Sequence, residues 1–191
     1  MKNIVILGSG AGSNAENIVH YFKDHPSIRV ASFVANKAEA GMVARAEKLG
    51  IPCKVFGRDA FYDTHSVVDF LQGIETDLVV LAGFLWLIPQ ELIKAFPNRI
   101  VNIHPALLPK FGGKGMYGSK VHQAVIEAGE EESGISIHLV NAHFDEGEIL
   151  RQEKIKLDSA ETAGSLEGRI RVLEHRFYPI VIEQLLARSS G

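Results

Sequence analysis

Four short apolar runs, rich in valine and isoleucine, set the main constraint on the fold of this chain. They are Ile4–Leu7, Val30–Val34, Leu78–Ala82 and Ile100–Ile103. None alternates strictly with polar residues, which is typical of strands buried on both faces. Segments with helical spacing separate them, and these are Ala15–Lys23, Lys37–Leu49 and Ala60–Leu71, the last with Asp59 as its expected N-cap. This alternation predicts an α/β fold with a Rossmann-like, open, mostly parallel twisted sheet and helices on both faces.

The pattern changes after Gly134. Two strand-like runs, GISIHLV and EILRQEKIKL, are joined by a polar turn around DEGE, which predicts an antiparallel extension at the C-terminal end of the sheet. A long amphipathic helix is expected from Glu161 to Leu186, with Thr162 as a possible cap. The segment Lys110–Lys120 has four glycines and no periodicity, so we expect either a mobile active-site loop or a plain connector.

Size and charge narrow the class of protein. A chain of 191 residues that is 46% hydrophobic fits a single globular domain over residues 1–191. Its net charge of −3 gives no basic surplus for nucleic acid or an anionic membrane. The lone cysteine, Cys53, is expected to pack in the fold, and the N-terminal run IVIL is too short for a signal peptide or a membrane span. We therefore expect a cytoplasmic protein.

A glycine-rich turn, LGSGAGSN, follows the first strand and opens the first helix. Backbone N–H groups and the helix dipole favour a phosphate at such a place. A dinucleotide site would need glycine at Ser13 and an acidic residue near Asn36, and a P-loop would need a lysine. Two interpretations stay open: a site for a phosphate monoester at Gly12, Ser13 and Asn14, or a structural turn capped by Ser13.

Asn102 and His104 stand at the end of the fourth apolar run, in VNIHPALLP. Residues two apart on a strand project to the same face. Pro105 and Pro109 end the strand, and ligands of open parallel sheets bind outside the carboxyl ends of strands. An amide N–H and an imidazolium N–H that converge there would stabilise the oxyanion of an acyl transfer.

A histidine in that role needs a carboxylate neighbour, and HFDEGEI offers Asp145, Glu146 and Glu148. Asp145 is favoured because Gly147 lets the chain bend back, whereas Glu146 fits a solvated turn. Metal binding is the competing interpretation for one set of residues: His104, His138, His143 and Asp145. No H-E-x-x-H or similar spacing is present, so no metal is predicted, and without a G-x-S-x-G motif a serine nucleophile is unsupported.

Six motifs together resemble a known family, in the order GSGAGSN, LAGFLWLI, NIHPALLPKF, SGISIHLV, FDEGEIL and LEHRFYP. NIHPALLP marks the folate-dependent formyltransferases and hydrolases. The first turn and the Glu-His-x-x-Tyr-Pro ending are similar to the glycinamide ribonucleotide formyltransferases, and this similarity covers nearly the whole chain.

The resemblance implies a reaction and its partners. The formyl group of 10-formyltetrahydrofolate, a co-substrate, would pass to the amine of glycinamide ribonucleotide in de novo purine biosynthesis. The products would be formylglycinamide ribonucleotide and tetrahydrofolate. No metal, nucleic acid or membrane is implied, and the protein would be a monomer or homodimer.

The resemblance also assigns site residues. The catalytic residues would be Asn102, His104 and Asp145. The residues that bind the nucleotide would be Gly12, Ser13, Asn14, Arg171 and Glu174. The residues that bind the folate would be Phe84, Leu85, Trp86, Leu87, Ile88, Val140 and Asn141. Three features depart from the family pattern. Arg171 stands where relatives carry Lys or Gln, and Trp86 replaces an Arg of some members. The Lys110–Lys120 loop is longer than in similar members, and its Lys114 is a further candidate for binding phosphate.

Three other functions are alternatives to this interpretation. A methionyl-tRNA formyltransferase should carry a further nucleic-acid-binding domain and a basic surface. A formyltetrahydrofolate hydrolase should carry a regulatory domain before the first strand, which here is expected at residue 3. A non-catalytic nucleotide-binding module would make the three catalytic candidates a coincidence.

Overall fold

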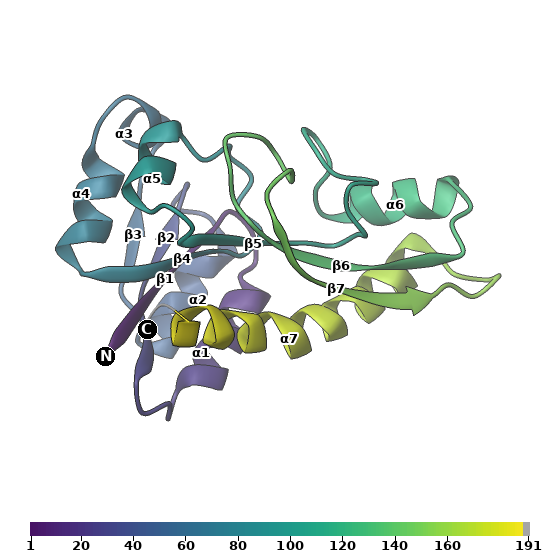
Figure 1. The fold of residues 1–191 in the computed structure, drawn as a ribbon, viewed down its shortest axis with the longest axis horizontal. Coiled ribbons are helices and arrows are strands. Elements are labelled where there is room, and N and C mark those ends of the chain that lie inside the picture. Colours follow the sequence, from purple (N-terminus) through teal and green to yellow (C-terminus); the bar gives the residue numbers. More distant parts are fainter. Residues whose placement is uncertain (189–191) are drawn as a thin grey trace.

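Seven strands form one sheet in the order β3-β2-β1-β4-β5-β6-β7, as Figure 1 shows for the computed structural model, which describes residues 1–188. The strands are β1 (Lys2–Gly8), β2 (Ile28–Ala35), β3 (Cys53–Val55), β4 (Thr76–Leu81), β5 (Ile100–His104), β6 (Glu132–Leu139) and β7 (Ile149–Lys156). The first five strands run parallel to one another, whereas β6 is antiparallel to both of its neighbours, β5 and β7. The predicted mostly parallel sheet with an antiparallel extension is confirmed. The expectation of a single domain over residues 1–191 stays a prediction.

Helices cover both faces of this sheet. They are α1 (Ser13–Phe22), α2 (Gly41–Leu49), α3 (Arg58–Tyr62), α4 (Ser66–Gly73), α5 (Gln90–Ala95), α6 (Ser119–Glu127) and α7 (Ala163–Arg188). The apolar residues of α1, α2 and α7 pack into one core, those of α3, α4 and α5 into the other, and α6 packs against α7 (Figure 1). Within the described residues, no helix is long and apolar enough to span a bilayer.

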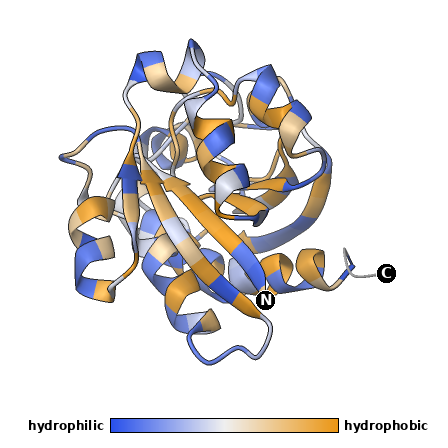
Figure 2. Ribbon diagram, turned by 90° about the vertical axis from the view of Figure 1, so that its left-hand side faces the viewer, coloured by the Kyte–Doolittle hydropathy of each residue, from blue (hydrophilic) through white to orange (hydrophobic). Residues whose placement is uncertain are grey.

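The central strands are apolar on both faces because each face is covered. In β1, Ile4 and Ile6 enter one core while Val5 and Leu7 enter the other, and all four are fully buried. Figure 2 shows the strands of the sheet mostly in the hydrophobic colour, whereas the outer helices carry both colours. The strands do not alternate between apolar and polar residues because helices cover both faces of the sheet.

The prediction of one continuous helix at Ala60–Leu71 is wrong, because this stretch forms two helices, α3 and α4. The side chain of Thr64 donates to the carbonyl of Ala60 at 3.0 Å and accepts from the N–H of Ser66 at 3.2 Å. It thereby ends α3 and helps to begin α4, which is how a threonine competes with the helix ladder. Gly57, and not Asp59, occupies the N-cap of α3.

Three short elements were not predicted: β3, α5 and α6. The helix α2 also begins at Gly41, later than the Lys37 expected from the sequence. The prediction for α7 is confirmed to within two residues, and Thr162 accepts a hydrogen bond from the N–H of Ser165 at 3.2 Å, as a helix cap does.

Tyr178 ties α7 to the sheet. Its side chain is fully buried, and its hydroxyl lies 2.8 Å from the carbonyl oxygen of Leu81 and 3.1 Å from that of Val101. These carbonyls belong to β4 and β5, the two strands that lead into the cavity described below. The tyrosine therefore fixes the long helix against the strands that carry the candidate site.

Tyr178→Phe should lower the free energy of unfolding by about 1–2 kcal/mol, because a buried hydroxyl and its contacts with two carbonyls are lost. Urea denaturation of both proteins measures this difference. Tyr21→Phe is the matched control, since the Tyr21 hydroxyl bonds to Glu183 at the exposed surface, and it should change stability by less than about 0.5 kcal/mol. Equal effects of the two changes would contradict the proposed anchor.

Candidate active site

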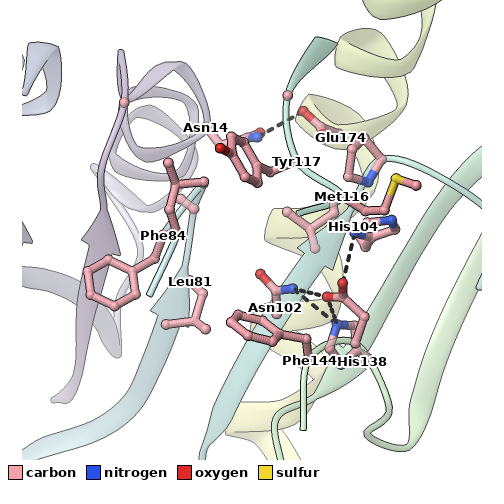
Figure 3. A pocket seen from close by; sticks show the side chains of 18 of the residues that line it. Asn14, Leu81, Phe84, Asn102, His104, Met116, Tyr117, His138, Phe144 and Glu174 are labelled. Carbon is pink, nitrogen blue, oxygen red and sulfur yellow. Dashed lines mark hydrogen bonds and ion pairs between the residues drawn. The ribbon is translucent and has the colours of Figure 1, made fainter. Parts of the chain in front are cut away.

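A cavity of about 640 Å³ opens at the carboxyl ends of β1, β4 and β5. This is the edge at which open parallel sheets bind ligands, and the volume lies within the range of small-molecule sites. Figure 3 shows Leu81 and Phe84 on one side of the cavity and Asn102, His104 and His138 on the other. Strand ends far apart in the sequence therefore line one pocket.

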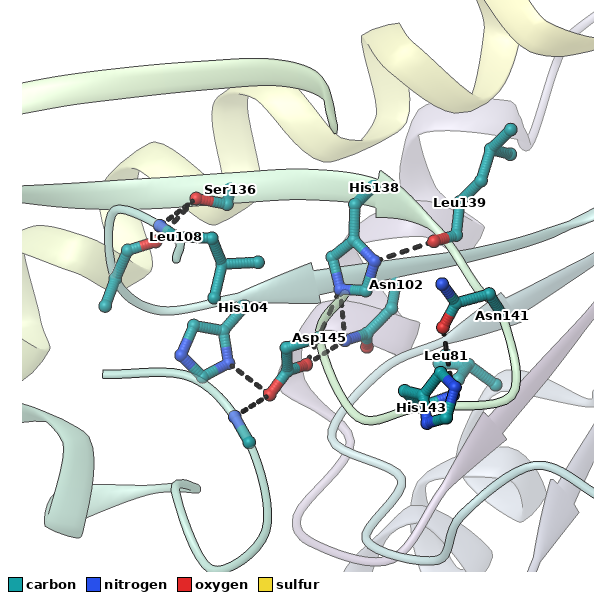
Figure 4. Close-up of polar contacts among 12 residues, drawn as sticks. Leu81, Asn102, His104, Leu108, Ser136, His138, Leu139, Asn141, His143 and Asp145 are labelled. Carbon is teal, nitrogen blue, oxygen red and sulfur yellow. Dashed lines mark hydrogen bonds and ion pairs between the residues drawn. The ribbon is translucent and has the colours of Figure 1, made fainter. Parts of the chain in front are cut away.

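The three predicted catalytic side chains meet in this cavity. Asn102 and His104 come from β5, and Asp145 comes from the loop between β6 and β7 (Figure 4). The Asn102 Nδ2 lies 3.3 Å from Asp145 Oδ1, and the His104 Nδ1 lies 3.5 Å from Asp145 Oδ2. The second distance is longer than a good hydrogen bond, so Asp145 attracts His104 by charge when the imidazole is protonated.

The main chain selects the tautomer of His104. The side chain is buried, and its Nε2 lies 2.7 Å from the carbonyl oxygen of Phe111, which can only accept a hydrogen bond. The Nε2 therefore carries the permanent proton, and Nδ1, which faces Asp145, is the nitrogen that gains or loses one. Burial lowers the pKa of His104 and outweighs the opposing influences of Asp145 and the Phe111 carbonyl.

Asp145 is held as a carboxylate. Burial acts to raise its pKa, but the nearby imidazoles of His138 and His104 and the N–H of Gly113 together lower it. The Gly113 N–H donates to Asp145 Oδ2 at 3.0 Å. Asp145 also has a φ of 57°, in the left-handed region that non-glycine residues seldom adopt. Such strain at a polar residue is typical of functional sites.

Gly147 makes the approach of Asp145 possible, as the sequence predicted. A Cβ atom at Gly147 would overlap the carbonyl oxygen of Leu139. The loop after β6 therefore folds back tightly on the end of its own strand, and only glycine fits at this position. The fold-back carries Asp145 over the end of β5.

His138 is a fourth polar member of this cluster. It pairs with Asn102 in the antiparallel register of β5 and β6, and its Nε2 lies 3.1 Å from Asn102 Nδ2. Its Nδ1 donates to the carbonyl of Leu139 at 2.8 Å, so Nε2 is left to accept from the amide. The sequence had suggested His138 only as a candidate metal ligand. A polar residue in an otherwise apolar strand was the available signal for this role. Its position opposite Asn102 could be seen only once the pairing of β5 with β6 was known.

The glycine-rich turn lines the opposite part of the cavity. Gly12, with a φ of 80°, is the N-cap of α1, and no side chain caps this helix, so the interpretation of a turn capped by Ser13 was wrong. The Asn14 Nδ2 donates to Glu174 Oε2 at 2.9 Å. Burial, more than any other influence, raises the pKa of Glu174. The start of α1 thus lines the cavity, with Glu174 beside Asn14.

The residues expected to bind the two ligands mostly line this cavity. They are Gly12, Ser13, Asn14, Arg171 and Glu174, and, on the apolar side, Phe84, Leu85, Leu87, Ile88, Val140 and Asn141. Arg171 is paired with Glu167 at 2.6 Å. Trp86 is not among the lining residues, because it packs 5.4 Å from the ring of Phe61, with the guanidinium of Arg58 at 5.9 Å.

The Lys110–Lys120 segment also contributes to the cavity, which agrees with the expectation of an active-site loop and not with that of a plain connector. Gly113, Lys114, Met116 and Tyr117 line it, and Figure 3 shows Tyr117 near Asn14. Its last two residues are helical, since α6 begins at Ser119. The Leu108–Pro109 peptide bond just before the segment, which the sequence left open, is cis.

The sequence profile of the formyl transferase family matches residues 2–182. The chain belongs to the formyl transferase family. The family membership predicted from the motifs is thereby confirmed. Solved structures agree with this assignment: a phosphoribosylglycinamide formyltransferase from Bacillus halodurans superposes with a TM-score of 0.88 at 33% identity, over 99% of this chain and 97% of that one.

Curated members of the formyl transferase family are similar over the full length of this chain. Phosphoribosylglycinamide formyltransferase of Bacillus subtilis is 36% identical, over 100% of this chain and 97% of that protein. The chloroplastic phosphoribosylglycinamide formyltransferases of Arabidopsis thaliana and Vigna unguiculata are 42% and 43% identical, and the chain spans 69% and 61% of their lengths.

Metal binding was the competing interpretation for the histidines and Asp145 of this cavity. Among residues 1–188, no group of three or more histidine, cysteine, aspartate or glutamate side chains is arranged to hold a metal ion. His138 and Asp145 contact Asn102 instead.

Stability should fall as the pH is lowered, because burial lowers the pKa of His104, His122 and His175. Each is neutral when folded and takes up a proton on unfolding below about pH 6.5. Their contribution is complete above that pH and is lost as the pH falls toward the folded pKa. Glu174, with a raised pKa, has the opposite dependence. Urea titrations from about pH 7.5 to about 5.5 should show a shallower slope for His122→Gln, and parallel curves would contradict this.

Gly12→Ala should weaken the binding of a phosphate monoester at least tenfold, on the order of 1.4 kcal/mol or more. A Cβ there would lie 2.9 Å from the Cβ of Met42, at a φ of 80°. Gly10→Ala is the matched control, because a Cβ at Gly10 meets nothing within 4 Å. Calorimetric titration with ribose 5-phosphate measures both, and equal losses would contradict a specific role for Gly12.

Proposed function

We propose that this chain transfers the formyl group of 10-formyltetrahydrofolate to the amine of glycinamide ribonucleotide. The observation that carries the proposal is the meeting of Asn102, His104 and Asp145 in a cavity between the glycine-rich turn and an apolar wall. Relatives that are 36–43% identical carry the name of this activity. The products would be formylglycinamide ribonucleotide and tetrahydrofolate, as in de novo purine biosynthesis.

The cavity offers a separate place for each substrate. The phosphate of the ribonucleotide would bind the N–H groups at Gly12, Ser13 and Asn14, with Arg171 and Glu174 toward its sugar and glycinamide parts. The flat pterin of the folate would lie along Phe84–Ile88 and the Val140–Asn141 backbone. The two reacting atoms would then meet at the end of β5. Trp86 would support the folate wall from behind and would not touch the ligand.

The chemistry needs donors for a developing oxyanion. The amine attacks the formyl carbon, and the formyl oxygen becomes negative as the new C–N bond forms. Asn102 would donate from Nδ2, exchanging its 3.3 Å contact with Asp145 for the oxygen, and His104 would donate from Nδ1. One such donor is worth about 2.7–4 kcal/mol of transition-state stabilisation.

The proton passes through the His104–Asp145 pair. The lowered pKa of His104 means that its imidazolium needs a carboxylate close by while the oxyanion exists. Asp145 would stabilise that charge and take the proton released by the attacking amine. When the intermediate collapses, the C–N bond to the folate breaks, and the folate nitrogen receives a proton from the same pair. No metal is needed for any of these steps.

Compartment and assembly stay predictions. We expect a cytoplasmic protein that is a monomer or homodimer, with only the two small molecules as partners. The two plant relatives are named as chloroplastic, so the compartment is to be measured and not inferred from similarity.

The function is tested by incubating the chain with both substrates and following the change in folate absorbance. Formation of formylglycinamide ribonucleotide, seen by mass spectrometry, would support the proposal. A reaction without the amine substrate separates transfer from hydrolysis, because a hydrolase would release formate in both. A chain that produces neither product would be better explained as a nucleotide-binding module.

Asp145→Asn should lower kcat by about 10²–10³-fold and change either KM by only a few fold, because the carboxylate acts mainly while charge develops. Asparagine tolerates the left-handed backbone found at this residue, so the loop should keep its shape. Glu146→Gln is the matched control, as it removes a neighbouring charge outside the cavity. Normal turnover of Asp145→Asn would overturn the assignment.

A further inference from the structure

An ion pair stands directly behind the glycine-rich turn. The Arg45 Nη1 of α2 pairs with the Glu16 Oε2 of α1, and the Arg45 Nε donates to the carbonyl of Ala11 at 2.8 Å. Neither Arg45 nor Glu16 lines the cavity. The proposed reaction therefore leaves both residues without a role.

Close packing holds Arg45 at this place. The start of α2 touches the turn, where the N–H of Met42 donates to the carbonyl of Gly10 at 3.0 Å. A Cβ built on Gly12 would lie 3.6 Å from the Cδ of Arg45. The guanidinium of α2 thus contacts both α1 and the turn that precedes α1, and its stem lies beside Gly12.

The charge of Glu16 conflicts with the expected ligand. A carboxylate in the first turn of α1 stabilises the helix, but a phosphate at the same helix end would be repelled by it. A phosphate monoester carries close to two negative charges at neutral pH. Arg171, the other arginine near the turn, is itself paired with Glu167 at 2.6 Å. The local charge balance therefore depends on Arg45.

We propose that Arg45 is a positioning residue for the nucleotide, which it serves by cancelling the charge of Glu16 behind the phosphate-binding turn. The contact with the Ala11 carbonyl aims the guanidinium, and the ion pair neutralises the carboxylate. This inference rests on the proposed function only in taking a phosphate monoester as the ligand of the turn. It assigns no contact between Arg45 and the substrate.

Four variants test this role. Arg45→Met removes the charge and keeps the stem that packs beside Gly12, whereas Arg45→Lys keeps the charge. Glu16→Gln is combined with Arg45→Met to remove both charges. Arg99→Met is the matched control, because Arg99 stacks on Phe96 at 4.9 Å and bonds to the carbonyl of Ala95, at the other end of the strands.

Arg45→Met should raise the KM for glycinamide ribonucleotide about tenfold, with kcat and the KM for the folate within about twofold. Arg45→Lys and the double variant should return to within about threefold of the parent, and Arg99→Met should match the parent. Added salt should reduce the defect of Arg45→Met, since both side chains of the pair are about a third exposed and exposed charges are screened. Thermal unfolding checks that each variant is folded.

Three results would overturn the proposal: an unchanged KM in Arg45→Met, a KM in the double variant as high as in Arg45→Met, or a defect that salt does not reduce. A second measurement does not depend on turnover. Inorganic phosphate should raise the melting temperature of the parent and of Arg45→Lys more than that of Arg45→Met. A chain without formyl transfer but with this phosphate response would refute the proposed function alone, while equal phosphate responses in active proteins would refute the role of Arg45 alone.

Discussion

The two neighbours of β5 run in opposite directions, and the candidate site depends on this arrangement. Its parallel pairing with β4 places the end of the strand at the edge where the glycine-rich turn also lies. Its antiparallel pairing with β6 puts His138 opposite Asn102 and forces the chain to turn back before β7. That return carries Asp145 across the end of β5, so a change of strand direction assembles groups from three parts of the chain.

Two strained residues hold His104 from opposite sides. Phe111 and Asp145 have φ angles of 56° and 57°, and each presents an oxygen to one of the ring nitrogens. Non-glycine residues in this region cost about 1–3 kcal/mol each, which the surrounding structure must offset. Part of that support is visible. The Ser136 hydroxyl bonds to the N–H of Leu108 and to the carbonyl of Ala106, and the Gln152 amide donates to the carbonyl of Leu108. The imidazole is therefore oriented before any substrate arrives, which favours fast chemistry at some expense of stability.

The sequence predicted what depends on local pattern and missed what depends on pairing or on the main chain. Buried strands and the long helix α7 follow from apolar runs and periodicity, and the same-face position of Asn102 and His104 follows from strand geometry. The break at Thr64 was missed because a single side-chain hydrogen bond decides it. The contact from Phe111 to His104 was invisible because a carbonyl oxygen is present at every residue. Trp86 was assigned to the folate by the resemblance of the whole run Phe84–Ile88 to the family, although successive residues outside regular structure need not face the same way.

The segment after the cis-proline contacts His104 and Asp145 through its backbone, by the carbonyl of Phe111 and the N–H of Gly113. Such contacts survive most replacements of the side chains that surround them. Replacing the side chain of Lys114, Met116 or Tyr117 therefore leaves these two backbone contacts in place. The side chains at this rim of the cavity, and with them the preference for a ligand, can therefore change while the catalytic candidates keep their backbone contacts.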